Sequence, residues 1–101
     1  MTTLDAFRDS VSGIAPPKEA QPALQALWWA AKGDLDRAHK IVQKDDGADA
    51  AWVHAYLHRV EGDLPNARYW YNQATRPAAT GPLEGEWIAM VQALFANTSK
   101  A

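Results

Sequence analysis

Two histidines and a carboxylate stand one helical turn apart in the middle of the chain. His54, His58 and Glu61 occupy positions i, i+4 and i+7, which share one face of an α-helix. Two imidazoles one turn apart can bind zinc together, and a carboxylate one turn further on could supply a third ligand. Two interpretations follow: a metal or small-ligand site centred on His54 and His58, or two half-buried histidines that are hydrogen-bonded to their neighbours.

Other catalytic chemistries lack their residues. The segment around His54 and His58 has no glutamate at the position that the His-Glu-x-x-His metalloprotease motif requires. The chain has no cysteine, and its glycines form neither a nucleophile elbow nor a phosphate-binding loop. We therefore expect a non-catalytic protein that binds no cofactor and no metal. His54, His58 and Glu61 are the candidate ligands if a metal does bind. An enzyme or small-ligand protein centred on the two histidines is the alternative.

Length and charge narrow the class of protein. A chain of 101 residues predicts one domain. Because 12 acidic residues exceed 10 basic ones, for a formal charge of −2, we do not expect a nucleic-acid partner. No apolar run approaches the roughly 20 residues that span a bilayer, and the first residues do not read as a secretory signal. We expect a cytoplasmic protein without a membrane partner.

Helical periodicity dominates the chain, and strand-like alternation is nearly absent. The pattern predicts an all-α fold of about six helices in antiparallel hairpins, within a single domain 1–101. It places Ile14 on the apolar face of the first helix and Leu64 on that of the fifth. Two repeat-like units, 22–44 and 50–76, stand between capping helices at 3–13 and 82–96.

The two predicted units share a turn. Gly33-Asp34-Leu35 and Gly62-Asp63-Leu64 are offset by 29 residues. Glycine permits the left-handed residue that ends a helix, and aspartate caps the next helix. A repeated turn between paired helices indicates a helical repeat.

The runs KGDLDRA (32–38) and EGDLPNARYWYNQA (61–74) resemble the turn and second helix of a tetratricopeptide repeat. The second run carries the family's residue types at Gly62, Asp63, Leu64, Ala67, Tyr71 and Ala74, followed by Pro77. The run WVHAYLHRVEGD is also similar to one found in small helical proteins of bacteria and fungi. Tetratricopeptide repeats are 34 residues long and about three are needed for a continuous core. Two units predict self-association into a homo-oligomer.

The resemblance implies that the first helix of each unit lines a concave groove. Its side chains would be Gln25, Trp29, Lys32, His54, His58 and Glu61, with Arg59 at the border. An indole, two imidazoles and two charges suit an extended peptide or a partner helix, with Trp29 as the anchor. The alternative is that these residues rim a packed core. Trp70 is a further candidate contact, unless it packs against Trp87 and Met90. We therefore expect an interaction module for an unidentified protein or peptide.

Overall fold

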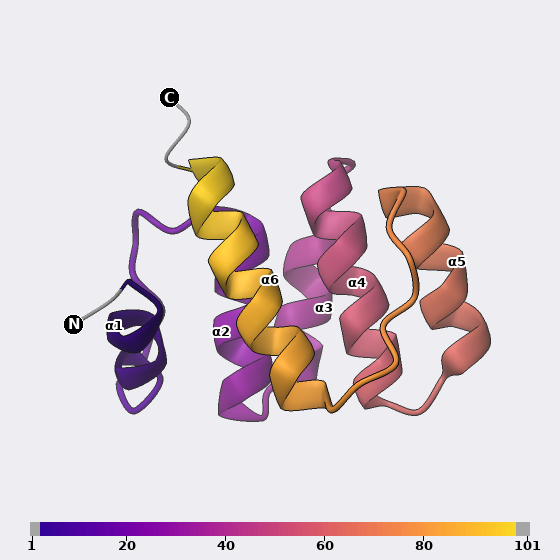
Figure 1. The fold of residues 1–101 in the computed structure, drawn as a ribbon. Helices are drawn as coiled ribbons and strands as arrows, with labels where there is room; N and C mark the ends of the chain where they lie inside the picture. Colours follow the sequence, from indigo (N-terminus) through magenta and orange to yellow (C-terminus); the bar gives the residue numbers. More distant parts are fainter. Residues whose placement is uncertain (1–2, 99–101) are drawn as a thin grey trace.

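A computed structural model describes residues 3–98, and over that range the chain is all-helical, with six helices and no strand (Figure 1). This confirms the predicted fold class. The helices are α1 (Thr3–Ser10), α2 (Pro22–Lys32), α3 (Leu35–Gln43), α4 (Ala48–Val60), α5 (Leu64–Ala74) and α6 (Leu83–Thr98). None of these helices is long and apolar enough to cross a membrane.

Helices α2 to α5 stand side by side as successive antiparallel neighbours (Figure 1). The turns within the pairs α2–α3 and α4–α5 have the same geometry. Gly33 and Gly62 have φ angles of 92° and 82°, in the left-handed region that side chains disfavour. The carboxylates of Asp34 and Asp63 each accept the backbone N–H three residues later, as helix caps do. The predictions made for these four residues are confirmed.

Helix α4 is covered on both sides. Every residue from Ala50 to Leu57 is buried. Helices α3 and α5 flank it, while α6 lies across α2 and α4 (Figure 1). The indole N–H of Trp87 in α6 donates to the carbonyl of Leu27 in α2 over 2.8 Å. Opposite faces of this helix are buried because different helices cover them.

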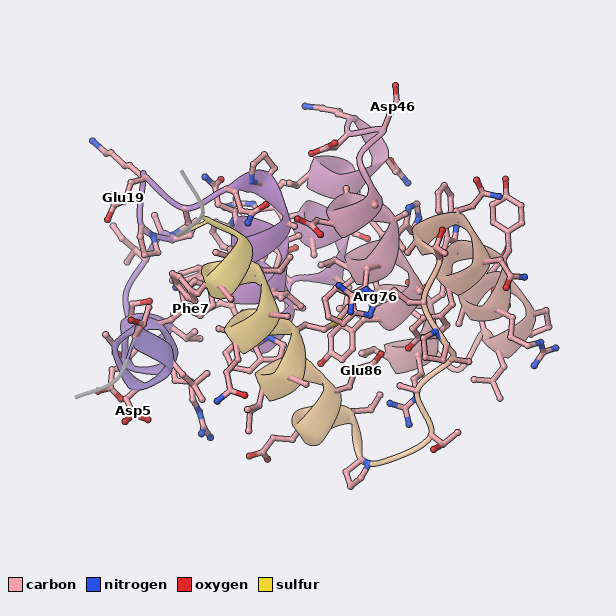
Figure 2. The ribbon with its side chains drawn as sticks, turned by 45° about the horizontal axis from the view of Figure 1, so that its top comes forward. Asp5, Phe7, Glu19, Asp46, Arg76 and Glu86 are labelled. Carbon is pink, nitrogen blue, oxygen red and sulfur yellow. The ribbon has the colours of Figure 1, made fainter. Side chains whose placement is uncertain are left out.

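One carboxylate holds α6 against the helical pairs. Glu86 is nearly buried, and it accepts from Arg59 of α4 over 2.9 Å and from the hydroxyl of Tyr71 of α5. Burial raises the pKa of Tyr71, and its hydrogen bond to Glu86 raises it further. The segment 75–82 that precedes α6 is anchored too, because the Arg76 guanidinium lies 3.7 Å from the centre of the Trp52 ring. Figure 2 shows Arg76 and Glu86 near the centre of the molecule.

Two sequence predictions about apolar faces are wrong. Helix α1 ends at Ser10, after which turn hydrogen bonds replace the helical ones, and this leaves Ile14 93% exposed in the following loop. Leu64 is 51% exposed, whereas Leu35, at the matching position after Asp34, is partly buried against the core. Phe7 is the buried residue of α1, and its ring contacts the rings of Trp87 and Phe95 in α6.

Candidate functional site

Three imidazoles meet between α3 and α4. His39 comes from α3, and His54 and His58 come from successive turns of α4. Their ring centres are 5.0 to 5.2 Å apart, and one nitrogen from each lies within 4.8 Å of the other two. The chain has three histidines in all, so every histidine of the protein is in this histidine cluster.

Glu61 lies beside the histidine cluster. Its two carboxylate oxygens are each 3.3 Å from an imidazole nitrogen, Nε2 of His39 and Nδ1 of His58. These are ion-pair distances, but neither contact has hydrogen-bond geometry, and both nitrogens are buried without a hydrogen-bond partner. A buried polar atom left in this state costs about 1–3 kcal/mol. The folded chain therefore carries two unsatisfied nitrogens that point to one carboxylate.

Trp70 of α5 fixes the innermost imidazole. Its ring stacks on His54 with centres 4.0 Å apart and planes 13° from parallel. The His58 ring also stacks with His54, with centres 5.0 Å apart. The pKa of His54 is lowered to about 4, chiefly by burial and in addition by the neighbouring His58 and His39. At neutral pH His54 is therefore an uncharged imidazole with a free lone pair.

A surface pocket of about 390 Å³ opens beside His54. Tyr69 and Trp70 form one corner of it, with ring planes 89° apart and centres separated by 5.1 Å. Asp45 and Asp46, in the turn between α3 and α4, stand at its rim. We call this the aromatic pocket; it is lined by Val42, Gln43, Asp45, Asp46, Gly47, Ala51, His54, Tyr69, Trp70 and Gln73.

Two residues predicted to line a groove tie down the N-terminal part of the chain instead. Gln25 donates to the carbonyl of Ala20 over 2.7 Å. Lys32 donates to the carbonyls of Val11 and Gly13, after the end of α1. Their polar groups are therefore engaged within the folded chain, away from the histidine cluster.

Trp29 and Arg59 also lie apart from the histidine cluster. The Trp29 ring packs edge-on against Trp28 and lies under the Arg37 guanidinium, 4.5 Å from its centre. It lines a shallow pocket at the α2–α3 turn. Arg59 points to Glu86 and α6. Of the eight residues predicted for binding, the structure brings together His54, His58, Glu61 and Trp70.

The sequence analysis missed His39, because its partners are 15 and more positions away on another helix. Its position beside Ala38, a buried residue of α3, was the signal that could have found it. The prediction that Trp70 packs against Trp87 and Met90 is wrong, since Trp70 stacks on His54.

No family model matches this sequence, and no curated protein or solved structure matches it either. Function is therefore inferred from the geometry of the site alone.

Proposed function

We propose that the chain is a non-catalytic interaction module that binds a protein or peptide segment through a basic side chain. The aromatic pocket carries this proposal. The rings of Tyr69 and Trp70, with planes at right angles, line this pocket together with two acidic residues, Asp45 and Asp46. Aromatic faces attract guanidinium and ammonium groups, and carboxylates pair with them. An arginine or lysine side chain fits this chemistry.

Contacts inside the protein support this recognition mode. The chain places a cation of its own over three tryptophan rings: Lys32 over Trp28, Arg37 over Trp29 and Arg76 over Trp52. Within residues 3–98 no such cation lies over Trp70. A partner's basic side chain would occupy at Trp70 the position that Arg37 occupies at Trp29.

The arrangement of the helices supports the location. The paired turns resemble those of tetratricopeptide repeats, a class in which the leading helices line a groove. Helix α6 lies across the leading helices α2 and α4 (Figure 1). A partner would therefore bind at the α3, α4 and α5 elements, where the aromatic pocket opens. Trp29, Lys32, Gln25 and Arg59 would support the fold rather than contact the partner.

The test uses two peptides with blocked termini that differ in a single charge. One is acetylated, amidated glycine–arginine–glycine, and the other is its citrulline analogue. Citrulline keeps the shape of arginine and removes its positive charge. We expect saturable shifts of the Trp70 indole N–H in proton–nitrogen NMR spectra with the arginine peptide and none with citrulline. Equal shifts with both peptides, or none with either, would contradict the proposal.

Matched variants locate the binding. Trp70→Ala should abolish the response to the arginine peptide, and Trp29→Ala should leave it intact, because Trp29 already lies under Arg37. Asp45→Asn with Asp46→Asn should weaken binding by about 10-fold, since a charge-assisted contact is lost. Asp36→Asn, an exposed aspartate outside the pocket, is the matched control. A response that survives Trp70→Ala would place binding elsewhere.

Self-association stays a separate prediction. Two helical pairs leave a short core, so a second copy could extend the stack. Light scattering at several concentrations should show a mass above that of one chain, and a single-chain mass at every concentration would contradict it. The cytoplasmic location and the absence of a nucleic-acid partner also stay predictions from charge and composition.

A further inference from the structure

We propose that the histidine cluster, completed by Glu61, is a binding site for one divalent transition-metal ion of the zinc type. This goes beyond the proposed interaction function and stands on different observations. The site lies behind the aromatic pocket, and the two share His54.

The distances among the three imidazoles, and those from Glu61 to His39 and His58, are close to the distances between ligand atoms in a zinc site. Zinc bound to nitrogen and oxygen at about 2.0–2.1 Å in a tetrahedron holds its ligand atoms about 3.3 Å apart. One carboxylate oxygen of Glu61 already lies 3.3 Å from Nε2 of His39, and the other lies 3.3 Å from Nδ1 of His58. The imidazole nitrogens, within 4.8 Å of one another, need to approach by less than about 1 Å each. We expect rotation of the His39 and His58 side chains to supply this movement, because Trp70 holds the His54 ring in place.

The unsatisfied nitrogens point to a ligand. Nε2 of His39 and Nδ1 of His58 are buried, lie close to one carboxylate, and make no hydrogen bond to it. Buried polar atoms in folded proteins are almost always satisfied. An ion placed between these nitrogens and Glu61 would satisfy all of them at once, so the metal-bound form removes a defect that the metal-free form carries.

The ligand types select the metal. Three imidazoles and one carboxylate suit zinc and its first-row neighbours, whereas magnesium and calcium prefer sites built of oxygen atoms. Four protein ligands in a tetrahedron leave no open position for substrate, which is typical of structural rather than catalytic zinc. The site therefore fits a stabilising ion and keeps the protein non-catalytic.

The position of the ligands gives the ion a role. His39 belongs to the α2–α3 pair, while His54, His58 and Glu61 belong to the α4–α5 pair or its turn. The contact between α3 and α4 is less extensive than the contact within either pair. A bound ion would join the two helical pairs at their weaker junction. It would also fix His54, which stacks on Trp70 at the aromatic pocket.

The first experiment uses the unaltered, tag-free chain, metal-free at first, with zinc as the probe. We expect binding of one zinc ion per chain by calorimetry and a higher melting temperature that a chelator reverses. Because every histidine is in the cluster, nitrogen-15 NMR of the imidazoles should show all three rings shifting together to metal-bound values. Cobalt(II) in place of zinc should give the strong visible absorption of a tetrahedral site.

Variants assign the ligands. His39→Gln is the principal one, since it removes a ligand from α3 and leaves the buried core of α4 intact; it should weaken zinc binding at least about 100-fold. Glu61→Gln should weaken it less and change the cobalt spectrum. Glu19→Gln, an exposed carboxylate before α2, is the matched control and should bind as the unaltered chain does. Circular dichroism verifies that each variant is folded.

Two results would overturn the proposal. One is the absence of saturable zinc binding and of imidazole shifts in the unaltered chain, which needs no variant and no assumption about folding. The other is zinc binding that persists unchanged in His39→Gln and Glu61→Gln. Neither result bears on the arginine-peptide test, because the imidazole shifts and the indole shift of Trp70 are separate signals.

Discussion

Helices α2 and α4 carry side chains at matching positions of the two helical pairs, yet these side chains have different contacts. In α2, Gln25 and Lys32 donate to carbonyls of the N-terminal segment. In α4, the matching His54 and Glu61 meet the other imidazoles instead. The same backbone frame therefore carries side chains that anchor the N-terminal segment in one pair and side chains that gather imidazoles and a carboxylate in the other. Local contacts, rather than the repeated turn, decide which of the two arrangements forms.

The largest expected effect tests whether the two pairs share one core. Trp28 and Leu57 occupy matching positions and are fully buried. We expect Trp28→Ala to lower the free energy of unfolding by about 3–5 kcal/mol and Leu57→Ala by about 2–5 kcal/mol, because each leaves a cavity. Urea unfolding measures both. Leu64→Ala, at an exposed site, should change it by less than about 0.5 kcal/mol; a similar loss at Leu64 would contradict the assigned faces.

The next largest effect is a pH dependence of stability. It distinguishes the faces of α2 and α4 compared above, because only the face of α4 carries histidines. The pKa of His54 is about 4 in the folded chain against 6.5 for an ordinary histidine. Between these values the unfolded chain binds a proton that the folded chain does not. The metal-free protein should therefore lose stability as pH falls from 6.5 to about 4, by on the order of 3 kcal/mol.

Denaturant unfolding in the presence of a chelator measures this loss across the pH window. His39, His58 and Glu61 face the same cluster, so His54→Gln is the control that isolates one ring. We expect a shallower slope in that variant. An identical slope in both proteins would show that His54 is not held in its neutral form.

The smallest effect tests the equivalence of the two turns. Gly33→Ala and Gly62→Ala should each lower stability by about 1–2 kcal/mol, because alanine is strained in the left-handed region. The two losses should agree within about 0.5 kcal/mol. Gly85→Ala in α6, where an added Cβ meets open space, should instead raise stability by about 0.5–1 kcal/mol. Thermal unfolding of the three variants suffices, and unequal losses at the turns would break the equivalence.

Local features of the fold could be predicted from the sequence, and features between helices could not. The turn at Gly33 and its copy at Gly62 follow from the conformations that glycine and aspartate favour. The spacing of His54 and His58 placed them on one face of one helix. The position of His39 beside His54 and His58 depends on how α3 packs against α4. Periodicity within a single helix does not specify this packing.

Helix α6, the predicted C-terminal capping helix, also shows that packing between helices could not be predicted from the sequence. Its helical pattern was visible, but its place across α2 and α4 depends on Glu86 meeting Arg59 and Tyr71 from two different helices. Such a meeting of distant residues leaves no mark in local spacing. Arg59 was for this reason assigned to a groove, although its partner belongs to α6.

Helix α6 also has a consequence for synthesis on the ribosome. The chain emerges from its N-terminus, so α2 to α5 can pair before α6 exists. Until then the sides of α2 and α4 that receive Trp87, Met90 and Leu94 remain open to water. The nascent chain therefore exposes an apolar surface that chaperones could bind. Helix α6 covers this surface once it has been synthesised.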